Sequence, residues 1–341
     1  MKKYLIITYG CQMNEADSER IATLLERKGY KPAPDEKEAD FIIVNMCSVR
    51  QTAVDRIWGK TKELARLKIK NKKLKTVLTG CIIKTDRKKF LGLFDEIWQN
   101  KDFSEIPPKC QKKSAFLVPI SNGCNNSCTY CVVPETRGKL ICRDHKKILK
   151  EIKISVKNGA KEIWLLGQNV NDYASPADAS INFAKLLKAA AGIPGNFKIR
   201  FMSPNPKNFT KELMDVMTNS KKIDKFLHLP LQSGDNKILK KMNRPYTVEQ
   251  YEKLVREIRE KIPDINLTTD AIVGFPGETR LQFLNTVKLF KKIKFNLAYI
   301  SKYSARPGTA AFSLKDTVSL KEKKRREKIL REIITKNAEK L

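Results

Sequence analysis

Short apolar runs alternate with amphipathic segments along the first hundred residues of this 341-residue chain. The apolar runs, which have the length of buried strands, lie at 4–9, 41–45 and 75–79. The segments with helical spacing of apolar positions lie at 15–28 and 49–70. This alternation is typical of a parallel sheet with crossover helices. We therefore predict an α/β domain over residues 1–113.

The second half of the chain repeats the strand–helix unit six times. Candidate strands lie at 116–120, 162–166, 198–202, 225–229, 266–273 and 297–303, and helices between them include 248–261 and 280–292. Six units predict an incomplete (β/α) barrel over residues 114–318, with its site at the C-terminal ends of the strands. A polar stretch with two prolines at 101–114 is interpreted as a linker, and 319–341 as a basic C-terminal helix.

Composition narrows the class of protein. Hydrophobic residues make up 41% of the chain, as in globular proteins. The 68 Lys and Arg residues exceed the 37 Asp and Glu residues, which gives a net charge of +31. This excess favours a polyanionic partner, with nucleic acid as the first candidate. The lysine enrichment of an AT-rich genome is the alternative explanation.

Hydropathy gives no sign of export or of membrane insertion. No apolar stretch approaches the roughly 18 residues of a membrane span, and the apolar run near the N-terminus is too short for a signal peptide. We therefore expect a cytoplasmic protein without a membrane partner. Cysteines in such proteins are more often metal-binding or catalytic than disulfide-bonded, and this chain has eight.

Three of the cysteines, Cys124, Cys128 and Cys131, follow the first barrel strand with Cys-x3-Cys-x2-Cys spacing. Iron–sulfur clusters are normally held by four cysteines, so three thiolates in one loop predict a cluster with one open iron. The alternative is a structural zinc site with His145 or Cys142 as fourth ligand. Zinc sites more often use paired Cys-x2-4-Cys knuckles, and no second pair is present.

Another three cysteines, Cys11, Cys47 and Cys81, each follow one of the predicted N-terminal strands. The carboxyl ends of parallel strands share one edge of a sheet, so these thiols are expected to converge. A single cysteine at such a position would belong to the core, whereas three at the same position predict a second metal site. Cys110 and Cys142 fit neither triplet and are interpreted as ordinary free thiols.

Polar loops with glycine follow several of the predicted barrel strands. The strongest candidates for ligand contacts in them are Gly167, Gln168, Asn169, Gln232, Asp270 and Gly274. Glycine lets a backbone approach a ligand closely, and the amides and the carboxylate can bond a ribose, an adenine or a carboxylate. His228 is interpreted as a core histidine whose hydrogen bonds are satisfied.

The triplet spacing, with Tyr130 before its last cysteine, resembles the signature of the radical S-adenosylmethionine (SAM) enzymes. In that family the cysteines hold a [4Fe-4S] cluster whose open iron binds the amino and carboxylate groups of SAM. The resemblance implies a partial (β/α)6 radical SAM barrel. The residues expected to bind the cofactor there are Tyr130, Gly167, Gln168, Asn169, Gln232, Asp270 and Gly274.

From Lys3 to about Ala338 the chain is similar to the methylthiotransferases. These pair a flavodoxin-like N-terminal domain, which carries three cluster cysteines, with a radical SAM barrel. The segments 123–138 and 167–171 look specifically like the MiaB-type tRNA branch. The resemblance implies two [4Fe-4S] clusters, one at each cysteine triplet, so that all six cysteines are expected to be both metal-binding and catalytic.

By resemblance, the reaction inserts a methylthio group at C2 of N6-isopentenyladenosine beside the anticodon, using two SAM molecules and cluster-borne sulfur. That C–H bond is unactivated, so a radical is required, and cofactors supply such chemistry while the protein positions them. The implied partners are a tRNA anticodon stem-loop and a reducing donor such as flavodoxin or ferredoxin. The chain is expected to act as a monomer.

The chain departs from the family pattern at three places. Glu135 stands where the branch usually has tyrosine, and Asn205 where it usually has histidine. Family members also continue with a small RNA-binding β-barrel called TRAM, which is absent from the sequence up to Leu341; either the sequence is truncated there, or tRNA affinity rests on the remaining basic surface. Two alternatives stay open: a sister methylthiotransferase acting on threonylcarbamoyladenosine tRNA or a ribosomal protein, and a non-catalytic, zinc-stabilised RNA-binding protein.

Two clusters of basic residues are candidates for contacts with tRNA phosphates. One spans 60–75 with eight Lys and Arg residues, and the other spans 321–331. Solvated helix faces are the alternative explanation for both clusters.

Overall fold

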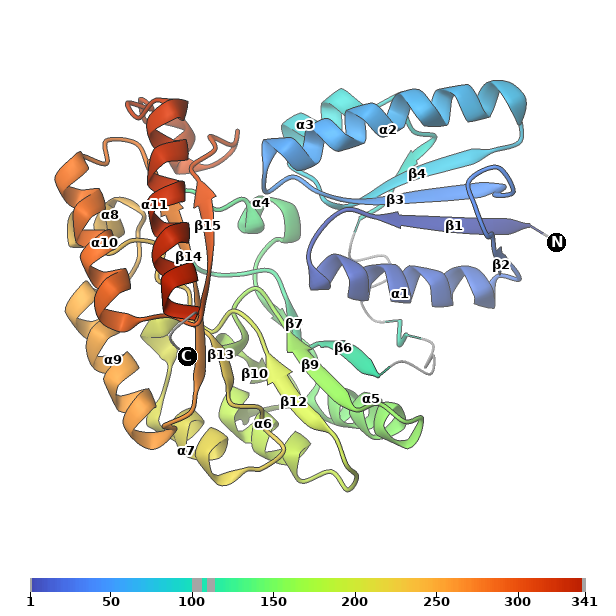
Figure 1. Ribbon diagram of the computed structural model, residues 1–341. Coiled ribbons are helices and arrows are strands. Elements are labelled where there is room, and N and C mark those ends of the chain that lie inside the picture. Colours follow the sequence, from blue (N-terminus) through green and yellow to red (C-terminus); the bar gives the residue numbers. More distant parts are fainter. Residues whose placement is uncertain (1, 100–105, 109–113, 339–341) are drawn as a thin grey trace.

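The computed structural model describes residues 2–99, 106–108 and 114–338. Residues 2–99 form a sheet with helices on both faces (Figure 1). Residues 114–338 form a curved set of strands with helices on its outer side. Cys110 and most of the predicted linker lie outside the described residues.

The N-terminal sheet has five parallel strands in the order β2-β1-β3-β4-β5. The strands are β1 (Lys3–Thr8), β2 (Lys31–Pro32), β3 (Phe41–Cys47), β4 (Lys75–Cys81) and β5 (Glu96–Ile97). This is the strand order of flavodoxin-like sheets, so the predicted fold class is confirmed. The two edge strands were not predicted, because two residues are too short to leave an apolar run.

Helix α1 (Gln12–Arg27) covers one face of this sheet, whereas α2 (Gln51–Lys70) and α3 (Lys84–Phe90) cover the other (Figure 1). Successive residues of a strand point to opposite faces. Ile43 of β3 therefore packs with Ile21 of α1, and Ile42 packs with Val54 of α2. Strand β2 lies on one side of β1 and β3 lies on the other, so the direction in which the chain adds strands reverses at this point. Ligand sites in such sheets lie beyond the carboxyl ends of the strands there.

The barrel contains six parallel strands. They are β6 (Ala115–Pro119), β9 (Glu162–Leu166), β12 (Lys198–Phe201), β13 (Phe226–His228), β14 (Asn266–Val273) and β15 (Leu297–Lys302). Regular pairing gives two three-stranded sheets, β12-β9-β6 and β13-β14-β15. A backbone bridge between Ile199 and Ile223 joins them. The arc is open between β6 and β15, as predicted for an incomplete barrel.

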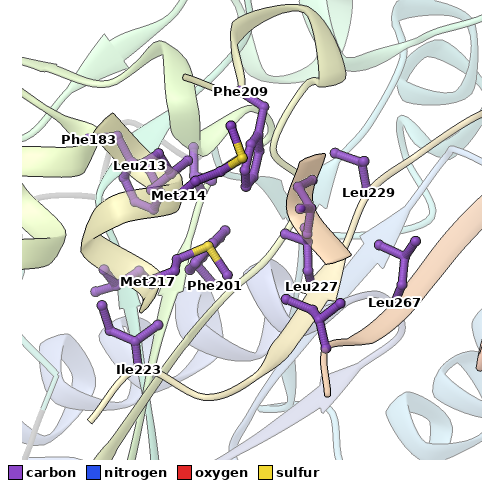
Figure 2. Close-up of a cluster of buried hydrophobic side chains, with 14 of the residues drawn as sticks. Phe183, Phe201, Phe209, Leu213, Met214, Met217, Ile223, Leu227, Leu229 and Leu267 are labelled. Atoms are coloured by element: carbon purple, nitrogen blue, oxygen red, sulfur yellow. The ribbon is translucent and has the colours of Figure 1, made fainter. Parts of the chain in front are cut away.

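Seven helices of the described part of the barrel unit surround these strands. They are α5 (His145–Lys157), α6 (Phe183–Ala191), α7 (Lys211–Asn219), α8 (Asn236–Lys241), α9 (Val248–Lys261), α10 (Arg280–Ile293) and α11 (Leu320–Ala338). Figure 2 shows α7 placing Leu213, Met214 and Met217 against Phe201 and Leu227, where the two sheets join. No helix in the described ranges is long and apolar enough to cross a membrane.

The N-terminal unit contacts the barrel at both of its open edges. At β6, Met13 and Ala16 of α1 pack with Leu117. At β15, the Arg50 guanidinium donates to Ser301 Oγ at 2.8 Å. The carboxyl ends of the N-terminal strands therefore lie next to the barrel loops.

Candidate active site: two cysteine triplets at one interface

The first triplet lies in a loop between two short paired strands, β7 (Ser121–Asn122) and β8 (Ile141–Cys142). Gly123, which begins the loop, has φ 80°, and an added Cβ there would overlap the Lys139 carbonyl oxygen. The Cys124 N–H donates to the Gly138 carbonyl at 3.1 Å. Glycine is thus required for the tight turn that brings Cys124 back towards its own loop.

The rest of the loop is bound to α8 and the residues that follow it. The Thr129 N–H donates to the Met242 carbonyl at 3.1 Å, and Thr129 Oγ1 donates to the Lys241 carbonyl at 2.9 Å. The Asn243 amide donates to the Ser127 carbonyl at 2.9 Å. Three consecutive residues that are distant in sequence, Lys241, Met242 and Asn243, therefore hold the loop in place.

Each thiol of this triplet accepts a hydrogen bond from the protein. The Asn126 N–H donates to Cys124 Sγ at 3.4 Å, Arg244 Nη1 to Cys128 Sγ at 3.4 Å, and the Val133 N–H to Cys131 Sγ at 3.5 Å. Burial raises the pKa of Cys131 to about 12, and the Val133 N–H opposes that shift. Donors around three thiols suit bound thiolates, because they stabilise the charged form.

Tyr130 packs against an apolar cluster that includes Met242, Phe275 and Tyr303. Burial raises its pKa well above the usual value. The predicted cofactor residue thus also anchors the cysteine loop to the barrel.

The second triplet lies at the carboxyl edge of the N-terminal sheet, as predicted. Cys47 and Cys81 are the last residues of β3 and β4 and are direct partners in the strand register. Cys11 follows β1 and is the N-cap of α1. Burial and then the charge of Cys81 raise the pKa of Cys11, and the hydrogen bond with Cys81 raises the pKa of Cys47. The three sulfurs are therefore close enough to interact.

Arg137, the last residue of α4 (Val133–Arg137), reaches this second triplet from the barrel loop. Its Nε donates to Cys81 Sγ at 3.0 Å, and its Nη2 donates to Asp17 Oδ2 on α1 at 2.7 Å. Its Nη1 donates to Asn122 Oδ1, two residues before Cys124, at 3.0 Å. One buried guanidinium therefore connects the surroundings of both triplets.

The thiols of Cys47 and Cys81 are hydrogen-bonded to each other. A hydrogen bond from Cys47 lowers the pKa of Cys81, and the Arg137 charge lowers it further against the effect of burial. The same hydrogen bond raises the pKa of Cys47. Burial disfavours the charge of Arg137, but Cys81 and Asp17 raise its pKa overall. The pocket therefore favours an anionic sulfur at Cys81.

Neither triplet has the arrangement of a single-ion site. Among the described residues, no three His, Cys, Asp or Glu side chains form a group that could hold one metal ion. His145 Nδ1 lies 2.8 Å from Ser175 Oγ, and Cys142 packs against the barrel core. The zinc site considered above is therefore not supported.

The loop after β9 holds three of the predicted cofactor residues. A Cβ on Gly167 would lie 2.7 Å from Ser121 Oγ. Gln168 Oε1 is buried without a hydrogen-bond partner in the part of the chain that is described, so it can accept from a ligand. The Asn169 side chain is instead used internally, since it bonds Asp172 and the backbone of Asn205.

Of the other three, Gln232 follows β13 and Gly274 follows β14, whereas Asp270 lies within β14. Gln232 has φ 71°, a strained conformation for a non-glycine residue of the kind that gathers at functional sites. Asp270 Oδ2 accepts from His228 Nε2 at 3.1 Å, and His228 Nδ1 lies 3.0 Å from Thr268 Oγ1. His228 is therefore a satisfied core histidine, as predicted. A Cβ on Gly274 would overlap the Lys323 side chain, so packing against α11 explains this glycine.

The two departures from the family pattern have local structural roles. Glu135 Oε1 accepts the Lys84 N–H at the start of α3, at 2.7 Å. Its Oε2 is buried without a hydrogen-bond partner within the described ranges. Asn205 accepts the Lys207 N–H and so caps a short 3-10 helix.

The basic clusters are less available than their sequence indicated. Lys60 is buried and forms ion pairs with Glu36 and Glu63. In α11, Arg325 and Arg326 both pair with Glu322. Within the cluster 60–75, the exposed basic side chains are Lys62, Arg66, Lys70, Lys72, Lys73 and Lys75.

Sequence reasoning missed Arg137, Asp17 and Arg244 as site residues. Arg137 lies inside the segment 123–138 that carries the family resemblance, which was the available signal. No signal in the sequence pointed to Asp17 or Arg244, because nothing in it places either side chain beside a cysteine.

Comparison with known proteins identifies the class of this chain. Residues 118–290 match the model of the Radical SAM superfamily, and residues 3–98 match that of Uncharacterized protein family UPF0004. Among solved structures, the radical SAM methyltransferase TsrM from Kitasatospora setae is similar with a TM-score of 0.66 and 16% identity over 92% of this chain and 75% of that one. The chain is therefore a radical SAM enzyme.

Curated relatives identify the family within that class. Proteins named tRNA-2-methylthio-N(6)-dimethylallyladenosine synthase are 41% identical in Carboxydothermus hydrogenoformans, over 95% of this chain and 81% of that protein, and 39% identical in Fusobacterium nucleatum, over 98% and 84%. The chain belongs to this family of methylthiotransferases. The resemblance inferred from the motifs is confirmed, and the sister-enzyme and zinc-protein alternatives are not supported.

Proposed function

We propose that this enzyme replaces the C2 hydrogen of N6-isopentenyladenosine beside the tRNA anticodon with a methylthio group. The names of the relatives support this substrate. One SAM molecule gives its methyl group to a sulfur and leaves as S-adenosylhomocysteine. The other would take up one electron and leave as methionine and 5′-deoxyadenosine, which carries the C2 hydrogen; the electron would be given back when the methylated sulfide bonds to the C2 radical.

The observation that carries the proposal is the meeting of two cysteine triplets at the interface between a flavodoxin-like sheet and a barrel. In our proposal Cys124, Cys128 and Cys131 hold the cluster that reduces SAM, and Cys11, Cys47 and Cys81 hold an auxiliary [4Fe-4S] cluster that carries the sulfur. We propose residues 1–113 as the auxiliary domain, 114–318 as the radical SAM barrel and 319–341 as a basic C-terminal segment, in which α11 spans Leu320–Ala338.

In this proposal, other residues stabilise the thiolates, contact SAM or support the loops. Asn126, Val133 and Arg244 stabilise the thiolates of the barrel triplet through the hydrogen bonds described above. The unpartnered Gln168 Oε1 is offered as an acceptor for SAM, and Gln232, Asp270 and Gly167 shape the same end of the barrel. Asn169 and Gly274 support the loops from within.

We further propose that the protein acts in the cytoplasm as a monomer, with electrons from a flavodoxin or ferredoxin. The net charge of +31 supports a tRNA partner, because lysine and arginine neutralise backbone phosphates.

The test separates the two triplets by product. Replacing Cys11, Cys47 and Cys81 with Ala should leave 5′-deoxyadenosine formation measurable under reducing conditions, while methylthiolated nucleoside disappears from the tRNA. Replacing Cys124, Cys128 and Cys131 should abolish both products. Cys142→Ala is the matched control, because this thiol belongs to neither triplet. Methylthiolated tRNA from the variant that lacks Cys11, Cys47 and Cys81 would contradict the proposal.

A further inference from the structure

We propose that Arg137 is a positioning residue of the auxiliary site, which holds the Cys81 thiolate through an N–H···S bond and thereby raises the reduction potential of the auxiliary cluster. This inference rests on the proposed function, in that Cys11, Cys47 and Cys81 must hold the cluster. Arg137 is a part of the barrel loop, so the barrel sets the electronic properties of a cluster bound by the other unit.

The hydrogen-bond geometry of Arg137 leaves the guanidinium little freedom. Its Nε, Nη1 and Nη2 donate to three different acceptors, Cys81, Asn122 and Asp17, at 3.0, 3.0 and 2.7 Å. Both Arg137 and Asp17 have side chains that are almost fully buried, at 2% and 6% exposure. A lysine could not replace this arrangement, because an ammonium group lacks the planar fork.

The charges explain the direction of the effect. Reduction adds one negative charge to a cluster that already has three thiolate ligands. Hydrogen bonds to the sulfurs and nearby charge set cluster potentials, and a buried cation acts through a low dielectric. Donation from Arg137 therefore stabilises the reduced form. Asp17 opposes it, because its carboxylate neutralises the guanidinium that bonds Cys81.

The same contacts fix the two sites relative to one another. Arg137 is six positions after Cys131, and its acceptor Asn122 is two before Cys124. Asn122 also donates to the Arg137 carbonyl at 3.5 Å. The barrel loop is thus closed on itself at the residue that bonds Cys81.

The experiment uses the full chain with Cys124, Cys128 and Cys131 replaced by Ala, so that the auxiliary cluster alone remains. Into this parent we introduce Arg137→Gln, Arg137→Lys or Asp17→Asn, and measure iron per chain and the midpoint potential by an EPR-monitored titration. Arg306→Lys is the matched control, since Arg306 is an equally buried arginine of the same interface that bonds Asp86 and Gln51 but no cysteine.

We expect the two Arg137 variants to shift the potential to more negative values and Asp17→Asn to shift it to more positive values, with Arg306→Lys unchanged. A structural role alone would weaken iron retention in all of them without opposite shifts. Equal potentials in the four variants, at full iron content, would overturn the inference. If the parent itself binds no iron, the assignment of the auxiliary cluster fails instead, and this inference with it.

Discussion

Asp86 on α3 and Arg306 in the loop after β15 form an ion pair in which each side chain is only 2% exposed. The two residues are 220 positions apart and belong to different units. Arg306 also bonds Gln51, the first residue of α2. The pair therefore holds the carboxyl side of the N-terminal sheet against the end of the barrel.

Removal of Asp86 should destabilise the protein strongly. Asp86→Ala leaves the buried Arg306 charge uncompensated, which costs about 3–5 kcal/mol. The measurement is urea unfolding of the apoprotein, followed by fluorescence and circular dichroism. Asp264→Ala is the control, because the Lys225–Asp264 pair is well exposed and such pairs contribute roughly 0–1 kcal/mol. An equal loss of unfolding free energy in the two variants would show that burial of the Asp86–Arg306 pair does not increase its contribution to stability.

Iron content should report the two triplets independently. With one cubane at each, the reconstituted protein should hold about eight irons and eight sulfides. Replacing Cys124, Cys128 and Cys131 with Ala should leave about half of both, and Cys142→Ala should leave all of it. Iron and acid-labile sulfide assays measure this. Full content in the triple variant, or zinc alone in the wild type, would contradict the assignment.

Gly123→Ala should disturb the barrel triplet selectively. Its φ of 80° is unfavourable for alanine, and the new Cβ would overlap the Lys139 carbonyl. We expect the variant to lose roughly half of its iron while the auxiliary site stays loaded. Gly192→Ala is the control, because its Cβ would meet no atom closer than 3.4 Å. Full iron content in Gly123→Ala would mean that the loop tolerates a different path.

RNA binding should depend on the exposed face of α2 rather than on Lys60. Changing Lys62, Arg66, Lys70, Lys72 and Lys73 together to Gln should weaken tRNA binding and reduce the slope of affinity against salt. Filter binding at several salt concentrations measures both. Changing Lys253 and Arg256 of α9 to Gln is the control, since both pair with glutamates of their own helix. An unchanged slope in the α2 variant would exclude this face.

The long strands could be predicted because each leaves a continuous apolar run. The expected strand at 266–273 matches β14, and the helix expected at 248–261 matches α9. Convergence of Cys11, Cys47 and Cys81 also followed from the sequence, since equal positions in successive parallel strands share one edge. The short strands β2 and β5 leave no such run and were missed.

The partners of individual polar side chains could not be predicted. Lys60 looked like part of a basic surface, yet it is buried against Glu36 and Glu63. Asn169 looked like a ligand contact, yet it is bonded within the protein. Such roles depend on which distant segments meet, and spacing along the chain carries no information on that.

The Arg137–Cys81 bond has a consequence for the order of events during synthesis. Cys81 and its strand leave the ribosome 56 residues before Arg137 does. The N-terminal sheet can therefore fold while the guanidinium that bonds its cysteine is still untranslated. Until the barrel loop emerges and docks, the auxiliary thiols are without their cationic neighbour. The metal site proposed for the N-terminal unit thus has its full surroundings only after the barrel loop is translated, although all of its cysteines are made first.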